Sequence, residues 1–147
     1  MYKHLLVATD GSKLSAKAVA HAIALAQGLG GKLTAFYASV DYLTPMYAEG
    51  IAYMSMTPKE FTAISREEAD KILKPISLKA EAAGVDFNSV NVIAAAPWEA
   101  ILVAAKKNKC DAIVMASHGR RGLSALLLGS ETQKVLTHTK LPVIVVR

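Results

Sequence analysis

The stretch Ala112-Ile-Val-Met-Ala-Ser-His-Gly-Arg-Arg-Gly-Leu-Ser-Ala-Leu-Leu-Leu-Gly-Ser130 decides the fold of this chain. Its first four residues are apolar and follow Asp111, which is typical of a buried strand. The residues from 131 to 136 have helical composition. A loop punctuated by glycines therefore joins the carboxyl end of a strand to the amino end of a helix. In a parallel sheet, free backbone N–H groups and the positive end of the helix dipole converge at such a junction, so an anion is expected to bind there.

The same loop has two interpretations. It carries His118, Arg120 and Arg121, and these basic side chains favour a phosphate site. However, residues 130–133 (Ser-Glu-Thr-Gln) also fit a capping box, in which Ser130 bonds a helix N–H group and the glutamine reaches back. In that case Gly129 is only a turn residue and the arginines are only solvated. The loop alone leaves both interpretations open.

The rest of the chain alternates strand-like and helical segments. Short apolar runs predict strands at 5–8, 33–37, 85–94, 112–115 and 141–146, and helical periodicity predicts helices at 13–29, 57–84, 97–109 and 131–136. The sequence from 38 to 56 has no clear period and is interpreted as a long surface loop. Because the expected strands are apolar on both faces, the pattern predicts an open parallel sheet with helices on both sides and right-handed crossovers.

Composition limits the class of protein. A chain of 147 residues predicts one domain, 1–147, and no window is apolar for long enough to predict a membrane helix. The start of the chain does not look like a signal peptide, and the single cysteine, Cys110, excludes an internal disulfide and a cysteine-rich metal site. We therefore expect a cytoplasmic protein. The net charge is +5, but the lysines are scattered and only 6% of residues are aromatic, so a nucleic-acid partner is not expected.

The sequence also lacks the motifs of several enzyme classes. The chain lacks a Walker A motif, because Ser130 and not lysine follows Gly129, and it lacks the G-x-G-x-x-G and G-x-S-x-G motifs. Its four histidines do not have metal-ligand spacing. What remains is a ligand crevice between two turns, 9–12 and 116–130, at the carboxyl ends of strands. Asp10 could accept hydrogen bonds from ribose hydroxyls or a base amino group there, or it could be only a turn or helix-cap aspartate.

Four segments resemble the universal stress protein family: 7–12 (Val-Ala-Thr-Asp-Gly-Ser), 111–119, Gly129-Ser130 and 142–146 (Pro-Val-Ile-Val-Val). The resemblance covers essentially the whole chain. The ATP-binding branch of the family carries G-x2-G-x9-G-[S/T], and this chain has the same spacing with Ala116 in place of the first glycine. The resemblance implies a Rossmann-like α/β fold of the adenine nucleotide alpha hydrolase type, with five parallel strands in the order 3-2-1-4-5. It also implies a homodimer formed through the last strand.

The resemblance further implies an adenine nucleotide, ATP or else ADP or AMP, bound with Mg²⁺. The adenine and ribose would lie near Asp10 and Ser39, and the phosphates against Gly119, Gly129 and Ser130. The residues implied to bind it are Ala8, Thr9, Asp10, Ser39, Met115, Ala116, His118, Gly119, Arg120, Gly129, Ser130, Glu131 and Thr132. An alanine at 116 costs little at negative φ and about 1 kcal/mol at positive φ.

Such proteins act as regulators or chaperone-like factors in stress, with protein partners that the sequence does not identify. They are not enzymes beyond slow ATP hydrolysis or autophosphorylation. A different interpretation keeps the fold but not the ligand. In that interpretation the chain is a nucleotide-free dimeric interaction module whose loop only caps a helix.

Overall fold

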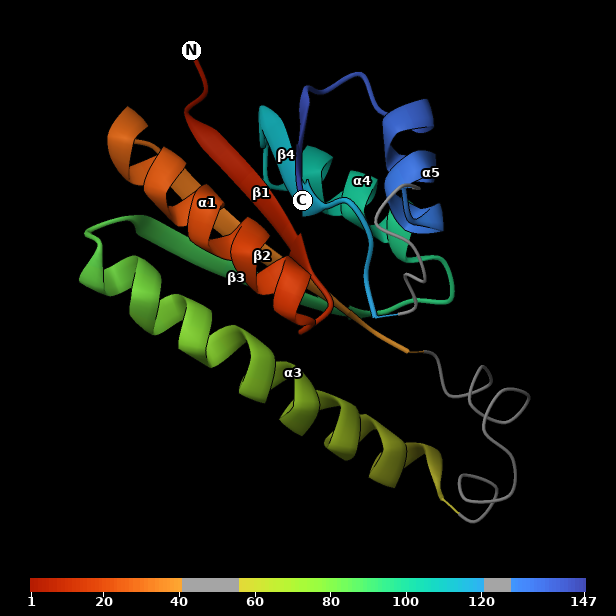
Figure 1. Cartoon of the computed structure of the whole chain (residues 1–147). Helices are drawn as coiled ribbons and strands as arrows, with labels where there is room; N and C mark the ends of the chain where they lie inside the picture. The colour runs from red at the N-terminus through yellow and green to blue at the C-terminus, as the bar shows by residue number, and fades with distance from the viewer. Residues whose placement is uncertain (41–55, 121–127) are drawn as a thin grey trace.

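Five parallel strands form one sheet in the order β3-β2-β1-β4-β5 (Figure 1). The computed structural model describes residues 1–40, 56–120 and 128–147. The elements are β1 (His4–Thr9), α1 (Lys13–Leu29), β2 (Lys32–Ser39), α3 (Pro58–Ala82), β3 (Asp86–Ile93), α4 (Pro97–Lys107), β4 (Ala112–Ala116), α5 (Ser130–His138) and β5 (Val143–Val146). The expected single-domain α/β class and strand order are confirmed.

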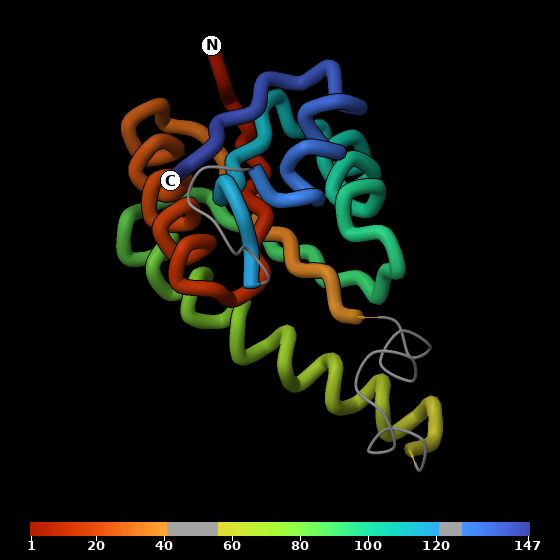
Figure 2. The backbone as a smooth tube through the Cα atoms, turned by 45° about the vertical axis from the view of Figure 1, so that its right-hand side comes forward, coloured from red at the N-terminus to blue at the C-terminus, as the bar shows by residue number. Residues whose placement is uncertain are grey.

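Helices cover both faces of the sheet, as the two views show (Figures 1 and 2). Helices α1 and α3 pack on one face around Leu5, Val7 and Leu33, and α4 and α5 pack on the other around Leu6 and Phe36. Successive residues of a strand point to opposite faces, so β1 supplies both cores and its apolar residues form an uninterrupted run. This burial is the physical basis of the strand prediction in the middle of the sheet.

The edge strand β3 departs from the expectation. Its sequence is Asp-Phe-Asn-Ser-Val-Asn-Val-Ile, and all eight of its residues are exposed or only half-buried. The expectation that every strand is apolar on both faces is therefore wrong here. The reason is position, because β3 pairs with β2 alone, and Asp86 at its start forms an exposed ion pair with Lys32 at 2.8 Å.

Helix ends follow local sequence signals. Thr57 and Glu60 form the reciprocal capping box at the start of α3, with the Thr57 N–H donating to Glu60 Oε2 at 2.8 Å. Gly30 ends α1 with φ of 60°, a conformation that disfavours residues with a side chain. Helix α3 continues through Pro75 to Ala82.

The loop predicted at 38–56 begins later than expected, because β2 runs to Ser39. Residues 41–55 of that loop lie outside the described part of the chain.

No helix in the described part of the chain has the length and apolar character needed to cross a membrane.

Candidate functional site

Two strand-to-helix turns meet at the carboxyl edge of the sheet. Strands β1 and β4 are hydrogen-bonded neighbours in the sheet. The crossover after β1 places α1 on one face, and the crossover after β4 places α5 on the other. The strand order therefore changes direction between β1 and β4, and this is the switch point at which sheets of this type bind ligands.

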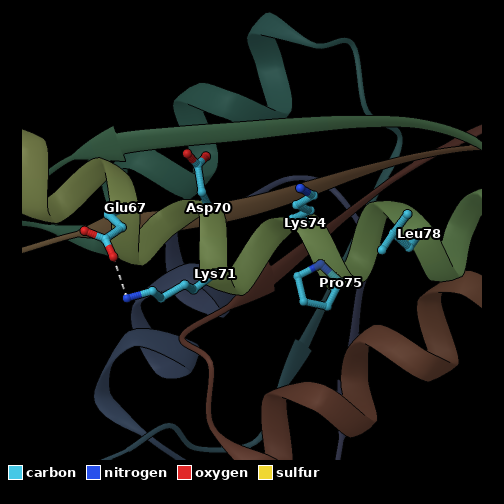
Figure 3. A pocket seen from close by; sticks show the side chains of 6 residues that line it. All are labelled: Glu67, Asp70, Lys71, Lys74, Pro75 and Leu78. Carbon is cyan, nitrogen blue, oxygen red and sulfur yellow. Dashed lines mark ion pairs between the residues drawn. The ribbon is translucent and has the colours of Figure 1, made fainter.

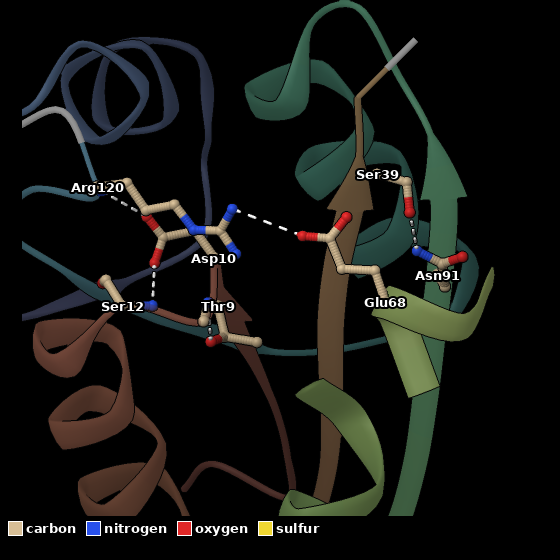
Figure 4. Close-up of polar contacts among 8 residues, drawn as sticks. Thr9, Asp10, Ser12, Ser39, Glu68, Asn91 and Arg120 are labelled. Atoms are coloured by element: carbon tan, nitrogen blue, oxygen red, sulfur yellow. Dashed lines mark hydrogen bonds and ion pairs between the residues drawn. The ribbon is translucent and has the colours of Figure 1, made fainter. Parts of the chain in front are cut away.

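Asp10 joins the two turns (Figure 4). Its Oδ1 accepts the Ser12 N–H at 2.9 Å, and its Oδ2 accepts the Arg120 N–H at 2.7 Å, across 110 residues of sequence. Partial burial alone would raise the pKa of Asp10. The hydrogen bonds from Ser12, from the Arg120 backbone and from Ser15 outweigh burial and hold that pKa below its usual value. Asp10 is therefore a turn residue before α1, and it also connects this turn to the loop after β4.

At two positions of the motif, Gly119 and Gly129, a side chain would clash with neighbouring atoms, while the backbone φ angle does not demand glycine. The described residues with positive φ do not include Gly119 or Gly129. A Cβ on Gly119 would collide with the Asp10 carboxylate, and a Cβ on Gly129 would lie 3.0 Å from His118 Cα. Ala116 ends β4 and does not have positive φ either, so the case in which alanine costs little backbone energy is the one that applies.

Helix α5 receives no side-chain cap from the residues that the structure describes. Gly129 is its N-cap residue, with φ −63° and ψ 152°, and Gln133 Nε2 donates to the Leu128 carbonyl at 3.0 Å. The interpretation of Ser130 as a capping-box residue is therefore wrong. Ser130 is already the first helical residue, and a cap must lie outside the helix to turn its oxygen onto the N–H groups. Ser130 is exposed at this end of the helix.

Neighbouring side chains hold α5 in place. Thr132 Oγ1 donates to the Ala116 carbonyl at 2.9 Å, and Glu131 Oε2 accepts the Trp98 N–H at 2.9 Å. The Gly129 N–H donates to the Ser117 carbonyl at 2.7 Å. Three of the residues implied as ligands thus have a positioning contact. The first-turn N–H groups of residues 130–132 have no acceptor within the helix, so they can bind an anion.

The other predicted site residues do not all lie at the same place in the structure. Ala8 and Met115 are buried in the core under α4 and α5, so their side chains do not reach the crevice. Thr9 Oγ1 lies 2.9 Å from Ser15 Oγ inside the first turn, and Ser39 is buried at the end of β2. His118 is half-buried with its Nδ1 3.2 Å from Ser117 Oγ. The groups that do come together at the carboxyl edge of the sheet are Asp10, Gly119 and Arg120, and Gly129 at the start of α5 contacts the same β4 turn.

Sequence reasoning missed three residues near Arg120 and Ser39 at this edge of the sheet. These three residues are Tyr37, Glu68 and Asn91. Glu68 Oε1 of α3 lies 3.7 Å from Arg120 Nη1 (Figure 4). Burial raises the pKa of Tyr37, and the nearby negative charge of Glu68 raises it further. Asn91 Nδ2 donates to Ser39 Oγ at 2.9 Å and to the Tyr37 carbonyl at 3.1 Å. Glu68 belongs to a charged helical stretch, which gives it no signal in the sequence.

Two surface hollows lie elsewhere. One of about 340 Å³ runs along α3 and is lined by Glu67, Asp70, Lys71, Lys74, Pro75 and Leu78, with Lys71 paired to Glu67 at 2.7 Å (Figure 3). The other, of about 360 Å³, lies where α4 and α5 end. Neither contains a predicted site residue. Within the described ranges, no three His, Cys, Asp or Glu side chains gather as a metal site would require.

Comparison with known proteins places the chain in a family. The sequence profile of the Universal stress protein family matches residues 1–147. The chain belongs to the universal stress protein family. Universal stress protein MJ0531 of Methanocaldococcus jannaschii is 32% identical over the whole chain and 83% of the relative. Universal stress protein YxiE of Bacillus subtilis is 33% identical, with complete coverage of both proteins.

Solved structures agree with this membership. The protein MJ0577 superposes with a TM-score of 0.83 at 27% identity, covering 99% of this chain and 96% of that one. A universal stress protein in complex with cAMP gives a TM-score of 0.70 at 28% identity, covering 99% and 97%. An Arabidopsis thaliana family protein with AMP bound has a TM-score of 0.67 at 16% identity, covering 97% and 90%, and shows the shared fold alone.

Proposed function

We propose that this universal stress protein is a regulator that binds an adenine nucleotide at the carboxyl edge of its sheet. The observation that carries the proposal is the amino end of α5, which receives no side-chain cap from the described residues and follows the same β4 turn that binds Asp10 through the Arg120 N–H. The relative solved with cAMP supports the class of ligand. The role is one of binding and regulation, with hydrolysis no more than slow.

The phosphates would bind where α5 begins. The helix dipole, the first-turn N–H groups and the exposed Ser130 hydroxyl all favour an anion there. Gly129 and Gly119 would keep the approach free of side chains. Arg120 would supply a positive charge from the adjoining loop.

The nucleoside would lie toward Asp10 and Ser39. An ionised carboxylate can accept about four hydrogen bonds, and each Asp10 oxygen accepts one backbone N–H in the structure. Ribose hydroxyls would take the other two acceptor positions in place of the Ser12 and Ser15 hydroxyls, which also hydrogen-bond to this carboxylate. The low pKa of Asp10 keeps it an acceptor at neutral pH. With ATP, a Mg²⁺ ion would be held chiefly by the phosphates and water, as this cation prefers.

Calorimetric titration tests the proposal. We expect the purified wild-type protein to bind AMP, ADP or ATP, each with and without magnesium, with a dissociation constant below 1 mM. Ala116→Gly should change that constant by less than about tenfold, because it removes one methyl group from a residue at negative φ. Absence of wild-type binding at millimolar nucleotide would contradict the proposal and favour the nucleotide-free module. Binding by Ala116→Gly alone would show that the methyl group blocks the site.

The same proposal includes a homodimer in the cytoplasm. Strand β5 is an edge strand with the sequence Val-Ile-Val-Val, and its first three residues are half-buried in the single chain. An uncharged apolar edge favours pairing, and a two-fold axis would close it. We expect light scattering to give a dimer mass at micromolar concentration and Val145→Lys to give a monomer or insoluble protein. A monomeric wild type would contradict this part.

A further inference from the structure

Arg120 stands between two negatively charged neighbours. Its backbone N–H donates to Asp10 at 2.7 Å, and its guanidinium reaches Glu68 of α3 at 3.7 Å (Figure 4). Its Nη2 lies 3.1 Å from the point that a Cβ on Gly11 would occupy, so the side chain extends over the first turn. With the backbone held, the guanidinium can exchange partners only by side-chain rotation.

Glu68 projects from α3 toward this guanidinium and places a negative charge beside it (Figure 4). Its influence extends to the Tyr37 hydroxyl on β2, since the negative charge of Glu68 contributes to the raised pKa of that group. About half of each side chain in the Arg120–Glu68 pair is exposed, at 53% and 49%. A partly exposed pair is weak, so an anion of higher charge can take Arg120 from it.

We propose that Glu68 is a specificity-determining residue of the nucleotide site, which competes with the phosphates for Arg120 and disfavours ligands of higher phosphate charge. This inference rests on the proposed function. A phosphate at the start of α5 must draw the guanidinium of Arg120 away from Glu68 and then experiences the uncompensated carboxylate. Both effects grow with each phosphate charge, and neither acts on an uncharged nucleoside.

The chain offers a matched control. Glu67 is the preceding residue on the same helix, and its carboxylate pairs with Lys71 at 2.7 Å (Figure 3). Glu67→Gln and Glu68→Gln change the net charge of the protein equally and preserve side-chain shape. Only the second removes the competitor for Arg120. Thermal unfolding of both variants checks that each is folded.

The experiment is a titration of wild type, Glu67→Gln and Glu68→Gln with adenosine, AMP, ADP and ATP at low ionic strength. For Glu68→Gln we expect unchanged adenosine affinity, AMP affinity raised by about twofold and ATP affinity raised by about fivefold, the size set by a weak exposed pair. Glu67→Gln should stay within about 1.5-fold of wild type throughout. Added salt at 0.5 M should reduce the graded effect because it screens exposed charges.

A double variant separates competition from repulsion. In the Arg120→Gln background, Glu68→Gln should raise ATP affinity by less than it does in the wild type, since no guanidinium is left to release. Equal effects of Glu67→Gln and Glu68→Gln across the series would overturn the inference, and so would a change in adenosine affinity as large as that for ATP. If no variant and no wild type binds any of the four ligands, the proposed function fails and the inference fails with it.

Discussion

Helices α1 and α5 begin at the same edge of the sheet after neighbouring strands, but their first turns are built differently. At α1, the Ser12 side chain accepts the Ser15 N–H at 3.1 Å, and Ser15 Oγ donates back to the Ser12 carbonyl at 3.0 Å. At α5, the N-cap is Gly129, and its first turn receives no side-chain cap from the described residues. The first helix start is closed by its own side chains, and the second is left open.

This difference has an energetic meaning. A side-chain cap stabilises a helix by about 1 kcal/mol, and α5 lacks that contribution. The N–H groups and dipole that a cap would satisfy remain available to an external anion. The Thr132 and Glu131 side chains instead fix the helix against β4 and α4. The fold thus gives up a small amount of stability at the place where we propose that a phosphate binds.

The largest expected effect comes from closing the open helix start. Gly129→Asp adds a negative charge at the proposed phosphate position, and its Cβ would lie 3.0 Å from His118 Cα. We expect calorimetry to show at least a hundredfold loss of AMP affinity. Gly28→Asp is the matched control, since a Cβ there has no atom within 4 Å, and it should bind like wild type. Unchanged affinity in Gly129→Asp would disprove phosphate binding at α5.

Ser130→Ala should separate binding from stability. Because Ser130 is not the cap, chemical denaturation should find the free energy of unfolding within about 0.5 kcal/mol of wild type. The lost hydroxyl contact to a charged phosphate oxygen should weaken AMP affinity by about tenfold or more. A stability loss near 1 kcal/mol with unchanged affinity would show instead that Ser130 caps the helix.

Asp10→Asn should weaken the link between the two turns. An amide is neutral and retains one acceptor oxygen, so one of the Ser12 and Arg120 N–H groups loses its acceptor and the other keeps an uncharged one. We expect a loss of about 1 kcal/mol at pH 7 after solvent screening. The folded-state pKa of Asp10 is lowered, so its contribution is present above the usual value of 3.8 and is lost as pH falls through the lowered pKa. Urea denaturation should therefore show a smaller difference between the proteins at pH 2.5 than at pH 7. A constant difference would exclude Asp10 ionisation as its cause.

Ser12→Ala should have the smallest effect and complete the comparison. It removes the α1 cap, and we expect a loss of about 0.5–1 kcal/mol in the free energy of unfolding, measured by denaturation. AMP affinity should fall by less than it does in Ser130→Ala. If the two serine variants lose equal stability, the two helix starts do not differ as described.

The sequence predicts the middle of the sheet well because burial on both faces leaves a continuous apolar run, as in β1 and β4. It predicts β3 less well because an edge strand is only half-covered. At the site, the capping-box pattern at 130–133 misleads, since the helix begins one residue early and the cap falls on Gly129. Glu68 could not be found at all, because only the packing of α3 beside β2 brings it to Arg120.

The most direct test is to follow backbone amide chemical shifts by NMR during titration with AMP. We expect the largest shifts at the amides of Ser130 and Glu131 and smaller shifts at Gly119 and Arg120. The smallest shifts should occur in the first turn of α1, where Ser12 already accepts from a backbone N–H. Shifts centred on the first turn of α1, or no shifts at 10 mM AMP, would contradict this expectation.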